Sequence, residues 1–278
     1  MGNLAKRFLT AGVLVPLILL ALFVDPTPWS ILAISTLAGM LAHDEFLRMA
    51  FAHTSSFTNN YLRIVVTSVG AMLVVVTTVV GEKVLPALII AGVLLITVIV
   101  LFQKQESAIA AKQMLISLAS IVYVPLLVAL WPLLKANQLS GNGAIWLLIT
   151  LMVAFLSDTM AYFAGRFLGK HKLFPLVSPK KTWEGSIGGL FGGMLATVGA
   201  GTFWLLPELP LHHAILLGCL GSAFGQLGDL VESLLKRGFG VKDSGNLLPG
   251  HGGMLDRVDG LLFTAPVIYS YVALQSLN

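Results

Sequence analysis

Long apolar runs alternate with short polar stretches along the chain. Nine runs can be distinguished, at about residues 8–24, 29–43, 64–81, 84–102, 113–134, 143–167, 185–206, 213–235 and 258–276. A helix needs roughly 17–25 apolar residues to cross about 30 Å of hydrocarbon. The pattern therefore predicts an all-α, polytopic integral membrane protein with about nine transmembrane helices.

The first 140 residues contain few groups suited to chemistry. Their run at 29–43 is short, and we expect its helix to continue past His43 as a surface helix. Asp44, Glu45 and Arg48 lie three or four residues apart, so they share a face that we interpret as an interfacial turn. Residues 1–140 are predicted to be a scaffold with dimer or lipid contacts, and residues 141–278 to form a catalytic region.

The placement of charge gives an orientation. Charged residues make up only 11% of the chain, against about a quarter in ordinary soluble domains. With the N-terminus in the cytoplasm, fifteen of the 17 Lys and Arg residues fall in inner loops, and only Lys83 and Lys135 fall in outer ones. Because inner loops carry excess Lys and Arg, this asymmetry predicts a cytoplasmic N-terminus in the inner membrane. The basic residues mark one side of a bilayer, so they do not indicate a nucleic-acid surface.

Ionisable groups concentrate in one stretch, residues 229–259. It holds five carboxylates, four Lys or Arg residues and one His, interspersed with Gly and Pro. Ionisable residues are rare in membrane segments and mark functional sites when they gather. We interpret the stretch as a site for a metal and a nucleotide polyphosphate at the cytoplasmic membrane surface.

A pair of carboxylates lies at each end of this stretch. Asp229 and Glu232 are three residues apart, as are Asp256 and Asp259, so each pair shares a helix face. Such pairs near Lys and Arg suit Mg²⁺, which takes one or two carboxylates together with substrate phosphate oxygens. The structural alternatives are an ion pair between Glu232 and Lys236, four residues on, and helix capping by Asp256.

A second polar loop precedes the run at 185–206. Ser178 followed by Pro179 is typical of a helix N-cap and first helical position. The free N–H groups of a helix start, together with Lys180, Lys181 and Thr182, favour an anionic ligand. The alternative is that the lysines are ordinary anchors on the cytoplasmic side.

Two further carboxylates belong to the same half of the chain. Glu184 lies at the membrane edge, and Asp158 lies toward the cytoplasmic end of the run at 143–167. A carboxylate at membrane depth must face a partner, water or an ion, so Asp158 is either functional or a hydrogen-bonding node between helices. Gly185, Gly189 and Gly193 recur every four residues and predict close packing of the runs at 185–206 and 213–235.

The stretch contains a long motif, Ser233-x-Leu-Lys-Arg-x-x-x-x-Lys-Asp-x-Gly-x-x-Leu-Pro-x-His-Gly-Gly-Met-x-Asp-Arg-Val-Asp259. It resembles, without a departure, the signature of the phosphatidate cytidylyltransferase (CDP-diacylglycerol synthase) family. The segment from Ser178 to Gly185 is also similar to that family. The resemblance covers about the last 130 residues, while the N-terminal half matches only in its hydrophobic character.

The resemblance implies an integral membrane enzyme that makes CDP-diacylglycerol and pyrophosphate from CTP and phosphatidate. It also implies a multi-helix homodimer with Mg²⁺ and a second, monovalent cation such as K⁺. Carried over by motif, Asp229 and Asp256 are the expected metal ligands, with Asp259 nearby.

The chemistry of the two substrates fits these residues. A phosphate monoester has a second pKa near 6, so phosphatidate is itself a nucleophile and requires no general base. The carboxylates are accordingly assigned to metal binding, and the cations to offsetting the charge of two anions brought together. Candidate catalytic residues are Asp229, Asp256, Asp259, Lys236 and Arg257. Candidate substrate-binding residues are Ser178, Lys180, Lys181, Thr182, Lys236, Arg237, Lys242, Asp243, His251 and Arg257.

Two alternatives remain open at this point. A CTP-dependent lipid kinase of the polyprenol or phytol type would use similar groups but transfer the γ-phosphoryl group. An ion-coupled transporter would use Asp158 and Asp229 as intramembrane ion sites. The clustering of charge at cytoplasmic ends disfavours a transporter, because transporter sites lie near the bilayer centre.

Overall fold

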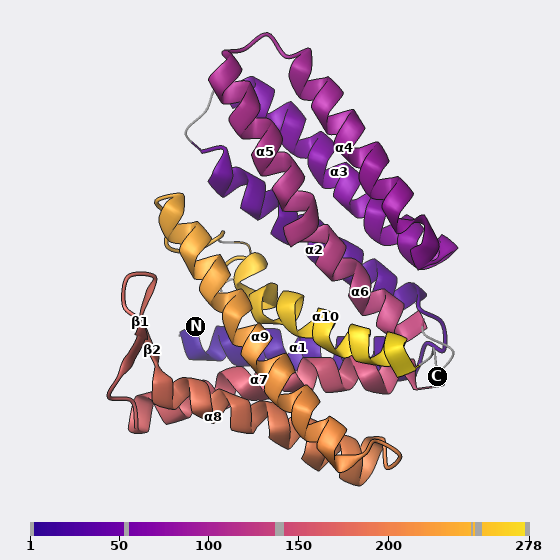
Figure 1. Ribbon diagram of the computed structural model, residues 1–278, viewed down its shortest axis with the longest axis vertical. Helices are drawn as coiled ribbons and strands as arrows, with labels where there is room; N and C mark the ends of the chain where they lie inside the picture. Colours follow the sequence, from indigo (N-terminus) through magenta and orange to yellow (C-terminus); the bar gives the residue numbers. More distant parts are fainter. Residues whose placement is uncertain (1–2, 53–55, 137–141, 246, 248–251, 276–278) are drawn as a thin grey trace. The chain divides into compact units, whose positions relative to one another are not determined.

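The apolar runs form helices in a computed structural model of the chain (Figure 1). The structure describes residues 3–52, 56–136, 142–245, 247 and 252–275. The chain divides into two compact units. The first is Met1–Ala136 with Asp243–Arg257, and the second is Asn137–Lys242 with Val258–Asn278.

The first unit contains the N-terminal helices. They are α1 (Asn3–Phe23), α2 (Trp29–Ala50), α3 (Ser56–Val80), the 3₁₀ turn η1 (Glu82–Val84), α4 (Leu85–Leu101), α5 (Ser107–Tyr123) and α6 (Pro125–Ala136). The helix of the short second run does continue past His43, as predicted, but it is not a surface helix there, because Glu45, Phe46, Leu47, Met49 and Ala50 are buried. The run at 113–134 is broken after Val124, because Pro125 lacks the N–H group that a continuous helix would use there.

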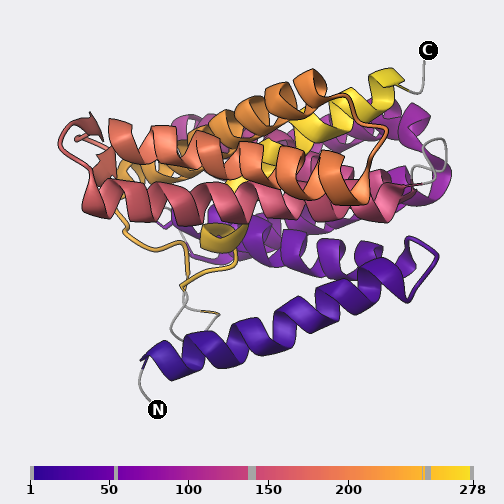
Figure 2. The same cartoon turned by 90° about the horizontal axis from the view of Figure 1, so that it is seen from below.

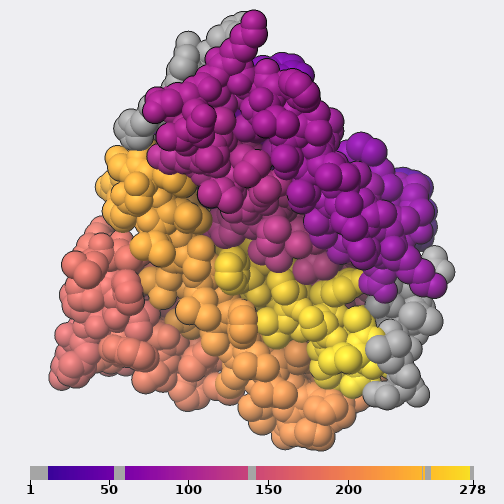
Figure 3. All heavy atoms as spheres, turned by 45° about the horizontal axis from the view of Figure 1, so that its top comes forward, coloured from indigo at the N-terminus to yellow at the C-terminus, as the bar shows by residue number. Residues whose placement is uncertain are grey.

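The second unit is built around three helices that lie side by side (Figure 2). Its elements are α7 (Gly143–Phe167), β1 (Lys172–Phe174), β2 (Ser178–Thr182), α8 (Trp183–Met194), the π-helical stretch η2 (Leu195–Leu205), α9 (Leu211–Gly238) and most of α10 (Leu255–Gln275). Figure 3 shows α9, in orange, bordering α10, in yellow. Thr264 donates a hydrogen bond to the carbonyl of Gly221 across this contact, at 3.1 Å.

Seven helical segments in the described part of the chain are long and apolar enough to cross a membrane. They are Asn60–Val80, Glu82–Leu101, Ser107–Ala136, Gly143–Phe167, Trp183–Leu205, Leu211–Gly238 and Leu255–Gln275. A shorter apolar helix, Gly12–Phe23, adds to them. The chain is therefore a multi-pass helical membrane protein, as the sequence predicts, while the count of nine crossings and the side of the N-terminus stay predictions.

Glycines of α8 allow its backbone to approach both neighbouring helices. A methyl group on Gly193 would meet Gly218 and Ser222 of α9, which confirms the expected packing of these two runs. Gly185 does not contribute to that packing as predicted, because a methyl group there would meet the carbonyl oxygen of Ala161 in α7, at 2.9 Å. Small residues at helix contacts permit such close approach in lipid.

Gly218→Val is expected to destabilise the second unit by roughly 3 kcal/mol or more. A Cβ at this position would lie 2.6 Å from the Cα of Met194 and 2.7 Å from the carbonyl oxygen of Gly193, so backbone would have to move. Thermal unfolding in detergent measures the effect. Gly238→Ala is the matched control in the same helix, since a methyl group there meets nothing within 4 Å. Equal melting temperatures for the two variants would contradict the packing account.

The loop between α7 and α8 corrects one prediction. Ser178 and Pro179 do not start a helix. They open strand β2, which pairs antiparallel with β1, Phe174 opposite Ser178 and Lys172 opposite Thr182. The residue before a proline is driven toward extended backbone, and proline is tolerated in a strand at a sheet edge. The N-cap of α8 is instead Thr182, whose hydroxyl accepts a hydrogen bond from the Gly185 N–H at 3.1 Å.

Candidate active site

Three carboxylates of the second unit converge where α9 meets α10. Asp229 and Glu232 come from the C-terminal half of α9, and Asp259 from the first turns of α10. One oxygen of each lies within 4.8 Å of the other two. We call Asp229, Glu232 and Asp259 the acid cluster. Its carboxylate oxygens are the type of ligand that a hard cation such as Mg²⁺ prefers.

Two lysines contact the acid cluster. Lys181 Nζ lies 2.7 Å from Asp229 Oδ2, so β2 supplies a cation to α9. Lys236 Nζ lies 2.5 Å from Glu232 Oε2, which confirms the ion pair inferred from their four-residue spacing. Glu232 is only 1% exposed, so its charge would be costly without this partner. The site thus combines carboxylates for a cation with ammonium groups for an anion.

A cavity of about 400 Å³ adjoins the cluster. This size is within the usual range for small-molecule sites. Its lining includes Asp158, Tyr162, Arg166, Leu173, Lys180, Lys181, Thr182, Gln226 and Asp229. Three of these side chains are cations, so the cavity suits an anionic ligand beside the carboxylates. We call it the basic cavity.

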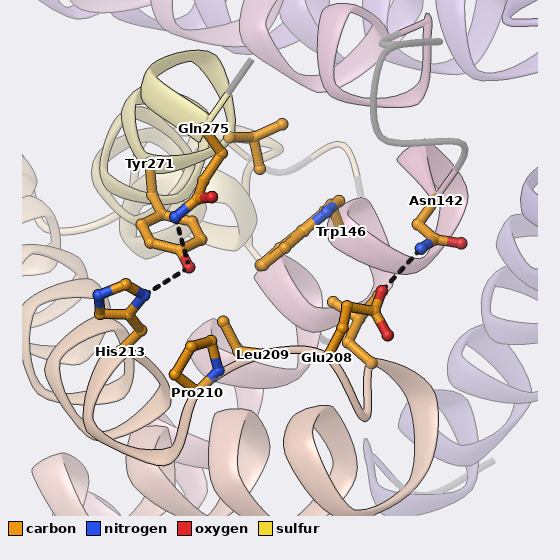
Figure 4. A pocket seen from close by; sticks show the side chains of 10 residues that line it. Asn142, Trp146, Glu208, Leu209, Pro210, His213, Tyr271 and Gln275 are labelled. Atoms are coloured by element: carbon orange, nitrogen blue, oxygen red, sulfur yellow. Dashed lines mark hydrogen bonds between the residues drawn. The ribbon is translucent and has the colours of Figure 1, made fainter. Parts of the chain in front are cut away.

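A second cavity of similar size, about 410 Å³, lies at the opposite ends of α7 and α9, and Figure 4 shows the side chains that line it. Glu208 accepts a hydrogen bond from the Asn142 amide there at 3.1 Å, and His213 lies 2.9 Å from the Tyr271 hydroxyl. Among the residues that the structure describes, its lining contains no Lys or Arg. The described lining thus lacks the cations that a triphosphate needs, so the basic cavity is the better candidate.

The structure assigns local contacts to several predicted site residues. Thr182 is buried and caps α8, while Ser178 is half-buried in β2. Glu184 accepts hydrogen bonds from the backbone N–H groups of Lys170 and His171, at 3.1 and 3.2 Å, and lies 2.6 Å from the His171 ring. Glu184 therefore fixes the backbone of the loop between α7 and β1, whereas the exposed Lys180 lines the basic cavity.

Sequence reasoning did not select two polar residues of the basic cavity. Arg166 was counted only as a cation of an inner loop, and its guanidinium donates to the Tyr162 hydroxyl at 2.7 Å. Gln226 donates to the carbonyl of Ser186 at 3.2 Å, joining α9 to α8. A polar side chain within an apolar run is the signal that could have identified Gln226.

Asp256 belongs to the first unit, where its carboxylate holds a loop. Oδ2 accepts hydrogen bonds from the Gly253 N–H at 2.8 Å and from the Ser244 N–H at 3.1 Å. These donors precede Asp256 in the chain, so the carboxylate binds loop N–H groups upstream of the helix start. Since Asp229 lies in the other unit, the predicted metal-binding pair of Asp229 and Asp256 stays a prediction.

Glu45 is the residue that sequence reasoning most clearly underestimated. It is 7% exposed, whereas an interfacial turn would leave it in water. Its carboxylate accepts hydrogen bonds from the Met254 and Leu255 N–H groups, at 3.0 and 2.9 Å, and from the Ser244 hydroxyl at 3.1 Å. The adjacent Asp44 instead pairs with Arg48 at 2.7 Å and with Arg63 at 2.6 Å, and its place at a membrane interface stays a prediction.

The remaining candidate residues lie in or beside the loop after α9. Arg237 is exposed and donates to the carbonyl of Val241 at 3.1 Å. Lys242, Asp243 and Arg257 are exposed. His251 lies outside the described residues. The roles of these residues in binding substrate stay predictions.

Comparison with known proteins identifies the family. A sequence model described as "Cytidylyltransferase family" matches residues 5–275. The chain is 46% identical over 145 residues to a phosphatidate cytidylyltransferase of Bacillus subtilis (strain 168), covering 51% of this chain and 53% of that protein. It is 48% identical over 130 residues to the protein of the same name in Staphylococcus aureus (strain COL), covering 46% and 49%. The matched part of the chain thus spans about half the length of these curated relatives.

Proposed function

Because the chain belongs to the cytidylyltransferase family, we propose that it transfers the cytidylyl group of CTP to phosphatidate. The products are CDP-diacylglycerol and pyrophosphate. The names of the B. subtilis and S. aureus relatives support this choice of lipid acceptor. The observation that carries the proposal is the acid cluster beside the basic cavity, because the reaction joins two anions and needs both kinds of group.

The substrates set the demands on the site. Phosphatidate carries nearly two negative charges at neutral pH, since the second pKa of a phosphate monoester is near 6. One of its oxygens attacks the α-phosphorus of CTP, and the bond to the pyrophosphate leaving group breaks. The nucleophile is already deprotonated, so the protein's contribution is positioning and charge compensation.

Residues of the second unit can provide that compensation. Lys180 and Arg166, both exposed in the basic cavity, are available to phosphate oxygens, and Arg favours bidentate contacts with them. Lys181 pairs with Asp229, so a phosphate bound by Lys181 would lie beside the acid cluster. The acyl chains of the lipid would stay in the bilayer, with the headgroup in the cavity.

The acid cluster fits a divalent cation by the chemistry of its donors. Asp229, Glu232 and Asp259 would hold Mg²⁺ through one oxygen each, within the separation of 4.8 Å noted above. A bound Mg²⁺ supplies charge stabilisation for a phosphorus centre under attack and for the departing pyrophosphate. We propose a second cation such as K⁺ as well, on the family resemblance alone.

The cellular setting completes the proposal. The placement of Lys and Arg supports an inner-membrane protein whose acid cluster faces the cytoplasm, where CTP is made. A homodimer, with contacts from residues 1–140, is proposed on the family resemblance.

The proposal is tested with CTP labelled at either the α- or the γ-phosphorus. Purified protein is incubated with phosphatidate and Mg²⁺, with and without K⁺. We expect the α label in lipid and the γ label in pyrophosphate. Label from the γ position in lipid would instead identify a CTP-dependent lipid kinase. No transfer to any lipid phosphate would overturn the assignment, and ion-driven flux into liposomes without CTP would favour a transporter.

Lys180→Gln is expected to raise KM for one of the two substrates about tenfold, with a smaller effect on kcat. The loss of one exposed ammonium group facing a phosphate corresponds to about 1.4 kcal/mol of binding. Steady-state kinetics with each substrate varied in turn measure the change. Lys83→Gln is the control, because Lys83 is an exposed lysine of η1 in the other unit. Unchanged KM values for both substrates would remove Lys180 from the site.

A further inference from the structure

The hairpin of β1 and β2 projects from the ends of α7 and α8 (Figure 1). Both helices are membrane-span candidates, one ending at Phe167 and the other beginning at Trp183. The fifteen residues between them are thus tied at both ends to the level of the lipid headgroups. A short segment held in this way cannot move far from the bilayer surface.

The hairpin exposes apolar side chains at its turn. Leu176 is 91% exposed and Phe174 is 51% exposed, with Pro175 between them. Leu168, at the foot of the hairpin, is 65% exposed. Apolar groups presented in this way are costly in water, and they gain by entering the boundary between headgroups and acyl chains.

Positive charge surrounds these apolar residues. The segment 166–182 contains five cations, Arg166, Lys170, Lys172, Lys180 and Lys181, and no acidic residue. All but Lys181 are exposed, and Lys181 is paired with Asp229. Cations beside exposed apolar groups are the combination that binds a membrane surface carrying anionic lipids.

The hairpin is a folded element with a fixed shape. Val177 is buried, and its N–H group donates to the carbonyl of Phe174 at 3.2 Å, closing the turn. At the base, the Trp183 N–H group donates to the carbonyl of His171 at 3.0 Å, and Glu184 binds the backbone on the opposite side of the loop. The exposure of Leu176 therefore follows from the fold of the hairpin.

We propose that this hairpin binds the surface of an anionic phospholipid bilayer and guides phosphatidate into the basic cavity. Phe174 and Leu176 enter the interface, while Lys170 and Lys172 contact lipid phosphates. Leu173 and Lys180 belong to the hairpin and also line the basic cavity, so the lipid-binding surface continues into the site. The guidance of phosphatidate rests on the proposed function, whereas the binding of the bilayer surface does not.

A fluorescent probe tests the contact with lipid directly. Leu176→Cys is made in a Cys219→Ala background, labelled with an environment-sensitive dye and placed in nanodiscs containing lipids with a quencher near the headgroup. We expect a blue-shifted emission and quenching that grow with the fraction of anionic lipid. Pro207→Cys is the control, because Pro207 is exposed in the loop joining the next two membrane segments and is followed by Glu208, with no Lys or Arg in the sequence between Lys181 and Lys236. Equal emission shifts and quenching at the two positions would overturn the proposal. So would an emission shift that depends on protein concentration, because it would report contact with a second copy of the protein.

Kinetics test the guidance of the substrate. For the double variant Phe174→Gln and Leu176→Gln, we expect KM for long-chain phosphatidate in vesicles to rise at least tenfold. The kinetic constants for a short-chain, water-soluble phosphatidate should stay at the wild-type values, because that substrate reaches the cavity without the membrane. Equal losses with both substrates would indicate a merely structural role and contradict the proposal. Failure of the wild-type protein with both substrates would count against the proposed function, and the quenching experiment would still decide the hairpin's contact with lipid.

Discussion

Asp259→Asn is expected to lower the turnover of phosphatidate by about a thousandfold or more. The substitution keeps the size of the side chain but removes one of the three carboxyl groups of the acid cluster. A metal site supplies several kcal/mol of charge stabilisation, and each 1.36 kcal/mol corresponds to a factor of ten in rate. Raising the Mg²⁺ concentration should recover part of the activity, because the variant binds the cation more weakly.

The stability of the same variant separates a chemical role from a structural one. Asp229, Glu232 and Asp259 repel one another, so the loss of one charge should leave the melting temperature unchanged or raise it. Glu208→Gln is the matched control, since it removes an exposed carboxylate at the opposite end of the second unit. Turnover of Asp259→Asn at the level of Glu208→Gln would remove Asp259 from the site.

Glu45→Ala is expected to destabilise the first unit by about 3–5 kcal/mol and to lower turnover as well. The substitution leaves the N–H groups of Met254 and Leu255 without their acceptor and removes one of the two carboxylates that contact the hydroxyl of Ser244. Each unsatisfied buried donor costs about 1–3 kcal/mol. Leu255 is also the first residue of α10, where a carboxylate stabilises the helix start through the helix dipole.

The effect on turnover would arise through the loop that Glu45 holds. Ser244 Oγ lies 3.1 Å from Glu45 Oε2 and 2.9 Å from Asp256 Oδ2, so the loop joins these two carboxylates. Glu45 is thus a positioning residue for the segment that contains Asp256. Glu106→Ala, which removes an exposed carboxylate of the same unit, is the control. If Glu45→Ala does not fold, Glu45→Gln takes its place, because it keeps one acceptor oxygen. It should show a partial loss of both stability and turnover. Wild-type stability and turnover in both variants would contradict the account.

The features of the fold that the sequence predicted correctly depend on residues that lie close together in the sequence. The helices follow from apolar runs, and the ion pair of Glu232 with Lys236 follows from one helical turn of spacing. The hairpin was missed because a Ser-Pro pair is common both at helix starts and in extended segments, and only pairing with β1 decides between them.

The role of Glu45 could not be read from its local sequence. Its hydrogen-bond partners lie 199 to 210 residues further along the chain, and no periodicity links a residue of α2 to them. Asp44 and Glu45 are adjacent and chemically alike, yet one is paired with exposed Arg48 and the other is buried. Tertiary packing determines which of the two is buried, so only the structure identifies Glu45 as the carboxylate that holds the loop.

The central claim, that the acid cluster holds a divalent cation for a reaction of CTP, is tested most directly by Mn²⁺ binding. Electron paramagnetic resonance on the purified protein, with and without CTP, counts bound Mn²⁺ and measures its affinity. The account predicts binding that CTP strengthens, that is lost or weakened at least about tenfold in Asp259→Asn, and that is retained in Glu208→Gln. Wild-type binding of Mn²⁺ by Asp259→Asn, in the presence of CTP, would contradict the claim.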